Sequence, residues 1–360
     1  MNLLPSLRRY GQSVWLTGFE RGWISRGELQ QYIESDGLRG VRSNFQSLQV
    51  AIEGHEYNRD FTILAQQGMS RNARSDYNYL IVRDLQLAAD FFKQVHSQTQ
   101  GCNGYVQIDL PPDALLQPET AIAAAQDIWQ SVGWSNLLLR IPATQLLLPV
   151  IEHLIGNRIN VNATLVFSPS IYEQVFDSYL RGLESLIQQG KLVSDVVCFT
   201  TVPIGRLDRA INPLITDTET SFSVMQAKLL YQHYRNLCQR VGEAFPLEIR
   251  WQSLSEGVKP LRLVWDCTDI PPESAWRYIQ TLVAPETVMM LDTLTLLRYR
   301  EISLLPALLT DDEQVEQLVT SGLSEISLDE RVDQLVNEEM ARSLNAFQQL
   351  LDTIEQKRRR

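Results

Sequence analysis

The sequence predicts an α/β protein built as one (β/α)8 barrel domain over residues 1–360. Eight short apolar segments alternate with segments of helical periodicity, and several are apolar at nearly every position, as in strands buried on both faces. No linker rich in Gly, Ser and Pro divides the chain. No glycine-rich dinucleotide or Walker loop follows a strand, which disfavours the alternative, a doubly wound open sheet.

The eight expected strands are short and are separated by helical segments, as in a TIM-type barrel. A length of 360 residues fits one such barrel, because barrels range from about 200 to more than 400 residues. The expected strands are Ser13–Leu16, Gly40–Ser43, Val106–Leu110, Leu137–Ile141, Asn160–Phe167, Val196–Thr200, Leu261–Trp265 and Thr287–Leu291.

Apolar residues at helical spacing predict helices between these strands. One such pattern runs from residue 172 to residue 186, and Ser170 with Glu173 predicts a capping box at its start. A long amphipathic helix is expected at about 328–356, close to the end of the chain. The basic residues Lys357–Arg360 suit the helix dipole, and we expect a solvated helix end there rather than a binding tail.

Charge and hydropathy exclude two classes of partner. The net charge of −11 lacks the basic field of a nucleic-acid binder, so no nucleic-acid partner is expected. No apolar run approaches the roughly 18 residues of a membrane span, and no membrane partner is expected. Arg8 and Arg9 come before any long apolar run at the N-terminal end, so no signal peptide is expected.

Cysteine and histidine spacing gives no metal-binding pattern. The 4 cysteines form no CxxC pair, and the 4 histidines form no HxxxH pair. We therefore expect free thiols, a cytoplasmic location, and neither a metal nor a cofactor.

Function in such barrels lies at the carboxyl ends of the strands and in the loops that follow. Polar residues at those positions are the candidates for catalysis and binding. The polar residues at these positions are Thr17, Asn44, Asp109, Arg140, Asn162, Thr164, Thr201 and Arg206.

Two motifs at adjacent strand ends carry a family resemblance. The run Leu139–Thr144 contains Ile-Pro-Ala-Thr, and the run Asn162–Ser168 follows on the next strand. Together they resemble the transaldolase family, and the resemblance extends from about residue 8 to about residue 355. Further matching segments are Gly11–Leu16, Ser43–Asn44, Ala227–Gln232, Thr287–Val288 and Thr293–Leu294. The resemblance implies a (β/α)8 barrel. For active members it implies transfer of a dihydroxyacetone unit between sugar phosphates in the pentose phosphate pathway.

The main departure from the family lies at Arg140. The resemblance implies a Schiff-base lysine directly before Ile-Pro-Ala-Thr, and this sequence has Arg140 there. Only 5 of the 32 basic residues are lysines, and we expect none of them at a strand end that faces the barrel mouth. A guanidinium keeps its protons and cannot form an imine.

Other positions also depart from what the resemblance implies. Thr17 replaces an aspartate and Asp109 replaces a proton-relaying glutamate, so both acid–base groups are altered. Asn44, Asn162, Thr164 and Arg206 are retained, and Arg206 matches the position of a phosphate-binding arginine in the family. The resemblance thus makes Thr17, Asp109, Arg140 and Thr164 the candidate catalytic positions, and Asn44, Asn162, Thr201 and Arg206 the candidate substrate-binding residues. Thr201 matches a sixth-strand serine, although Cys198 is an alternative. Further departures are Phe45 for proline, Leu147 for glycine, Cys267 for serine, and Ile270–Pro271 where a cation is expected.

Several candidates have a structural alternative. Arg140 either forms a buried ion pair with Asp109 or binds an anionic ligand. Arg206 either binds phosphate or pairs with Asp208 at the surface. Asn162 and Thr164 either bind substrate or only satisfy hydrogen bonds at the barrel mouth.

The sequence therefore predicts a transaldolase-like protein of carbohydrate metabolism, a transferase by descent that is catalytically impaired and works as a pseudoenzyme. Its candidate partners are a sugar phosphate, bound weakly, and another protein. One alternative is a working transaldolase that uses another lysine. A second is a non-catalytic interaction module whose barrel mouth is closed by Arg140, Phe45 and Leu147.

Overall fold

The computed structural model describes residues 3–214, 221–239, 246–254, 257–300, 308–309 and 328–359. Eight parallel strands form a closed barrel in the order of the chain, which confirms the predicted fold class. The chain divides into two compact units. The first comprises Met1–Val14 and Arg140–Asn337, and the second comprises Trp15–Leu139 and Glu338–Arg360. The extent of a single domain stays a prediction.

All eight strands occur where the apolar runs predicted them. β5 ends at Thr164, earlier than expected, because Leu165 adopts the left-handed backbone conformation and ends the extended run. β6 begins later than expected, because the side chain of Asn160 accepts the N–H of Val197 before the strand starts. The strands are β1 (Ser13–Thr17), β2 (Leu38–Arg42), β3 (Tyr105–Asp109), β4 (Leu137–Pro142), β5 (Val161–Thr164), β6 (Cys198–Pro203), β7 (Arg262–Asp266) and β8 (Val288–Leu291).

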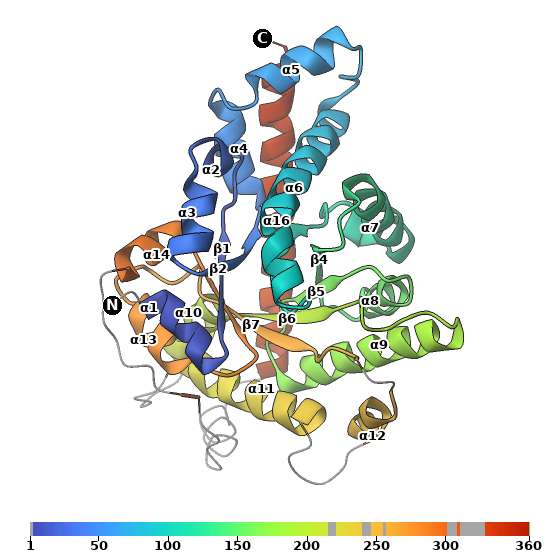
Figure 1. The fold of residues 1–360 in the computed structure, drawn as a ribbon, viewed down its shortest axis with the longest axis vertical. Coiled ribbons are helices and arrows are strands. Elements are labelled where there is room, and N and C mark those ends of the chain that lie inside the picture. The colour runs from blue at the N-terminus through green and yellow to red at the C-terminus, as the bar shows by residue number, and fades with distance from the viewer. Residues whose placement is uncertain are drawn as a thin grey trace. The chain divides into compact units, whose positions relative to one another are not determined.

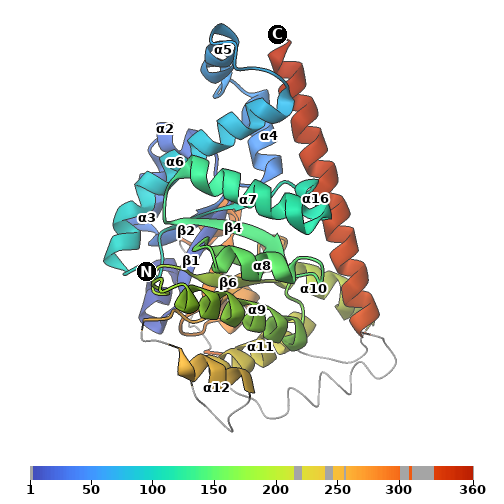
Figure 2. The same cartoon turned by 90° about the vertical axis from the view of Figure 1, so that its right-hand side faces the viewer.

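In the first unit, helices α8 and α9 lie side by side (Figures 1 and 2). Gly182 of α9 permits this approach, because a Cβ atom there would lie 2.7 Å from Cβ of Ile155 in α8. Among the described residues, the helices of eight or more residues that lie wholly within this unit are α8 (Leu148–Ile155), α9 (Pro169–Gln188), α10 (Ile204–Ile211), α11 (Phe222–Gln239) and α12 (Pro246–Ser253). The shorter ones are α1 (Leu3–Leu7), α13 (Ala275–Thr281) and α14 (Thr293–Tyr299).

The predicted capping box at Ser170 and Glu173 is wrong. The helix begins at Pro169, and Ser168 is its N-cap, with its hydroxyl accepting the N–H of Ile171 at 3.3 Å. Proline suits the first helical position, because it has a fixed φ and no N–H that needs a partner.

The second unit carries the longest helix between two strands, α6. Gly40 of β2 lets the sheet pack on an indole, because a Cβ atom there would lie 2.9 Å from the ring of Trp15. The helices of this unit are α2 (Gly22–Ser25), α3 (Glu28–Ser35), α4 (Phe45–Glu53), α5 (Asn58–Gln66), α6 (Ala73–Gln98) and α7 (Pro118–Val132).

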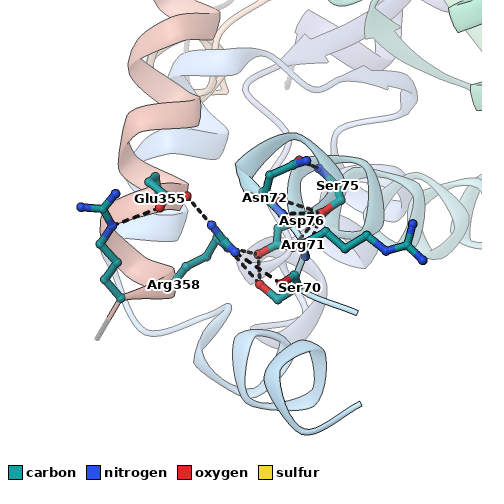
Figure 3. Close-up of polar contacts among 8 residues, drawn as sticks. Ser70, Arg71, Asn72, Ser75, Asp76, Glu355 and Arg358 are labelled. Carbon is teal, nitrogen blue, oxygen red and sulfur yellow. Dashed lines mark hydrogen bonds and ion pairs between the residues drawn. The ribbon is translucent and has the colours of Figure 1, made fainter. Parts of the chain in front are cut away.

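The predicted long C-terminal helix is confirmed as α16 (Leu328–Arg358). The expectation of a solvated basic end is wrong, because the last turn of this helix makes specific contacts. Arg358 forms an ion pair with the fully buried Asp76 at 3.0 Å and donates to the hydroxyl of Ser70 at 2.9 Å (Figure 3). Lys357 donates to the carbonyl of Gly54 at 2.6 Å. The last turn of α16 is thus held against the segment that leads into α6.

None of the helices that the structure describes is both long and apolar enough to span a bilayer.

Candidate functional site

Arg140 lies at the centre of a buried polar chain in the first unit. Its side chain projects from β4, and the residue is 4% exposed. Its Nη1 donates to Thr201 Oγ1 at 3.4 Å, and Thr201 Oγ1 donates to Asn162 Oδ1 at 2.8 Å. Three predicted site residues, from three consecutive strands, are therefore brought together.

The strand register explains this meeting. Side chains alternate between the faces of a strand, and paired residues of parallel neighbours share a face. Asn162 pairs with Phe199, and Thr201 pairs with Val264, so every second residue along β5, β6 and β7 lies on one face. By the same alternation, this face carries Thr164 at the end of β5 and Asp266 at the end of β7.

Thr164 is buried at the point where β5 ends. Its carbonyl accepts the N–H of Ala143 at 2.8 Å, and Val166 N–H donates to the carbonyl of Thr201 at 3.2 Å. Leu165, between them, has a φ of 60°, which costs a bulky residue about 1–2 kcal/mol. Its side chain packs in an apolar cluster with residues of α10, α11 and α16, which include Leu207, Met225 and Val332. This packing holds the strained turn that places Thr164.

Asp266 is a site residue that the sequence analysis missed. It lies buried at the carboxyl end of β7, and its Oδ1 accepts the N–H and the hydroxyl of Thr268 at 3.1 Å and 2.6 Å. An aspartate directly after an apolar strand was the available signal. Its turn shapes the loop that carries Asp269.

Arg206 lies in the first turn of α10, directly after β6, and forms an ion pair with Asp269. The expected alternative, pairing with Asp208, is wrong. The Asp208 carboxylate instead accepts hydrogen bonds from Ser221, Ser223 and Tyr278. Asp208 therefore joins α10 to α11 and α13, and Arg206 is held by the loop after β7.

Thr17, Asn44 and Asp109 belong to the second unit. Asn44 is the N-cap of α4, where its Oδ1 accepts Ser47 N–H at 2.8 Å and its Nδ2 donates to Thr17 Oγ1 at 3.3 Å. Asp109 forms an ion pair with Arg42 of the neighbouring strand, with Arg42 Nη2 at 2.8 Å. The capping geometry explains an asparagine at position 44, and the pairing of Asp109 with Arg140 stays a prediction.

The buried thiols of the first unit are poor nucleophiles. Burial raises the pKa of Cys198 and of Cys267 above the usual value of a thiol. Cys198 is the first residue of β6 and pairs with Val161, away from the carboxyl end of the strand. Thr201, and not Cys198, contacts Arg140.

The lysines lie in helices and loops of the chain. All five lysines fall within the described ranges, and none of them belongs to a barrel strand. Lys93 lies in α6, Lys191 follows α9, Lys228 lies in α11, Lys259 precedes β7 and Lys357 lies in α16. Across the described ranges, no group of three or more His, Cys, Asp or Glu side chains is arranged to hold a metal ion.

Comparison with known proteins identifies the class of this barrel. The family described as Transaldolase/Fructose-6-phosphate aldolase matches residues 23–356, and the chain belongs to this family. The chain is 28% identical to the transaldolase of Trichodesmium erythraeum over 99% of its own length and 97% of that protein. It is 28% identical to transaldolase 2 of Nostoc punctiforme with the same coverage, and 31% identical to the transaldolase of Mycobacterium tuberculosis over 79% of this chain and 77% of that protein.

Proposed function

We propose that this chain is a cytoplasmic transaldolase-family protein of carbohydrate metabolism that binds a sugar phosphate weakly but forms no Schiff base. The observation that carries the proposal is Arg140, at the position where the family resemblance implies the reactive lysine. Arg140 is buried and hydrogen-bonded to Thr201, so its guanidinium is held at the site.

Schiff-base chemistry requires a neutral amine. Imine formation needs a nitrogen lone pair and loss of the amine protons, whereas a guanidinium is delocalised and stays protonated. The five lysines lie in helices and in the loops before β6 and β7, and none of them belongs to a barrel strand. The positions of these lysines support the loss of amine catalysis, together with the replacements Thr17 and Asp109.

The first unit nevertheless keeps groups that suit a sugar phosphate. Thr201 and Asn162 offer a hydroxyl and an amide, which match the donors and acceptors of a polyol. Arg140 and Arg206 supply positive charge for a phosphate. Because Arg206 is already paired with Asp269, we expect a dissociation constant on the order of 1 mM.

The second candidate function is a working transaldolase of the pentose phosphate pathway. The names of the relatives favour it, since each of those reported above is called a transaldolase. It would need an amine other than one at position 140.

Two measurements separate these functions. Incubation with fructose 6-phosphate and borohydride, followed by intact mass measurement, should add no mass, and turnover with erythrose 4-phosphate as acceptor should stay at background. Calorimetric titration with fructose 6-phosphate should show millimolar binding. A trapped adduct on any lysine would establish the working enzyme. Absence of both adduct and binding would favour the protein-interaction module.

A further inference from the structure

We propose that Asp269 is a specificity-determining residue, an internal anion that occupies Arg206 and weakens phosphate binding at this site. The inference rests on the proposed sugar-phosphate site. It assigns to the loop after β7 the role of disfavouring the phosphate group while leaving the sugar contacts unchanged.

The ion pair between Arg206 and Asp269 joins two strand ends of the first unit. Asp269 Oδ2 contacts Arg206 Nε, and the same oxygen lies 3.6 Å from Nη2 of Arg209. One carboxylate thus faces two guanidinium groups. A phosphate that approached either arginine would be repelled by this carboxylate or would have to displace it.

The loop is shaped to present Asp269. Asp266 Oδ1 closes a tight turn with Thr268, and Ile270 N–H donates to the carbonyl of Cys267 at 3.3 Å. These bonds fix the backbone on both sides of residue 269. The hydrogen bonds within the loop therefore fix the position of the Asp269 carboxylate.

Helix α10 fits this loop closely at Gly205, the residue before Arg206. A Cβ atom at Gly205 would lie 3.1 Å from the carbonyl carbon of Asp269 and 2.8 Å from Cγ1 of Ile270. Only glycine allows this contact without movement of the loop. This close packing of α10 against the loop brings the guanidinium of Arg206 to the carboxylate of Asp269.

Both side chains of the pair remain open to solvent, at 22% for Arg206 and 31% for Asp269. A dissolved anion can therefore reach the arginine, and competition between the two anions is physically reasonable. A neutral sugar has no charge with which to compete for Arg206, so its affinity should not depend on Asp269.

The test is a comparison of wild type with Asp269→Asn, which removes the charge and keeps the shape. Binding of inorganic phosphate, fructose 6-phosphate and fructose is measured by calorimetric titration at one low ionic strength. Both phosphate-bearing probes should bind about tenfold more tightly to the variant, and fructose should bind equally to both proteins. Asp269→Ser serves as a second neutral variant if the first fails to fold.

Two controls locate the effect. Asp195→Asn removes the carboxylate of another ion pair of the first unit, with Arg158, and should leave phosphate binding unchanged. Arg206→Ala combined with Asp269→Asn should abolish the gain. Phosphate affinity that is equal in wild type and both neutral variants would overturn the inference, and so would a gain that survives Arg206→Ala. Absence of fructose 6-phosphate and fructose binding in every protein would instead refute the proposed sugar-phosphate site itself.

Discussion

Arg140→Lys tests how much of the family chemistry has been lost. A lysine at this buried position would have a lowered pKa, which favours the neutral amine needed for an imine. We expect borohydride trapping with fructose 6-phosphate to yield an adduct, which the wild type lacks. Turnover should still remain at least about 10²–10⁴-fold below that of an intact enzyme, because each acid–base role contributes about that much and both are altered here.

The structure supplies the reason for this remaining deficit. Asp109 forms an ion pair with Arg42 at 2.8 Å, so its carboxylate is already engaged by a neighbouring side chain where the resemblance implies a proton relay. Thr17 carries a hydroxyl where the resemblance implies a carboxylate. The triple variant Arg140→Lys, Thr17→Asp, Asp109→Glu should therefore exceed the single variant by about 10²-fold or more.

Arg262→Lys is the matched control, since Arg262 is also a buried arginine of a barrel strand in the same unit. Its Nε donates to the carbonyl of Glu286 at 2.9 Å, outside the candidate site. This variant should give no adduct. Full activity from the single change at position 140 would refute the reasoning, because it would show the acid–base groups to be intact.

Two further predictions concern stability and are measured by chemical denaturation. Phe347→Ala should lower the free energy of unfolding by about 3–5 kcal/mol, because the ring is 2% exposed and packs against Phe45 and Tyr77 at centroid distances of 5.0 Å and 5.1 Å. Leu344→Ala, on the same helix but 42% exposed, should change it by less than about 0.5 kcal/mol, and equal losses would contradict the packing argument. Burial raises the pKa of Asp84 from its ordinary value of 3.8 to about 6. The contribution of Asp84 to the stability of the fold is therefore most favourable below pH 4 and is lost as the pH rises through 6. Asp84→Asn should therefore gain up to about 3 kcal/mol relative to wild type between pH 4 and pH 7, and a difference that stays constant over this range would rule out the titration.

The barrel could be predicted from the sequence because its signals are local. Each strand is a short apolar run, and the periods of strands and helices differ enough to separate them. The long C-terminal helix followed from the same periodicity. Failures came at element ends, where a single contact decides: Leu165 ended β5 through its backbone conformation, and Ser168 replaced Ser170 as the cap of α9.

The proximity of Arg140 and Thr201 in the candidate site could also be predicted from the sequence. Strand order and the alternation of side chains place these two residues near one another in any barrel of this register. The partners of the charged side chains were decided only by the tertiary structure. Arg206 pairs with Asp269 rather than Asp208, and Arg358 pairs with the buried Asp76. An arginine side chain is long enough to reach several carboxylates, and which one it meets depends on loops and helices distant in the chain. Local sequence patterns therefore do not predict which carboxylate an arginine pairs with.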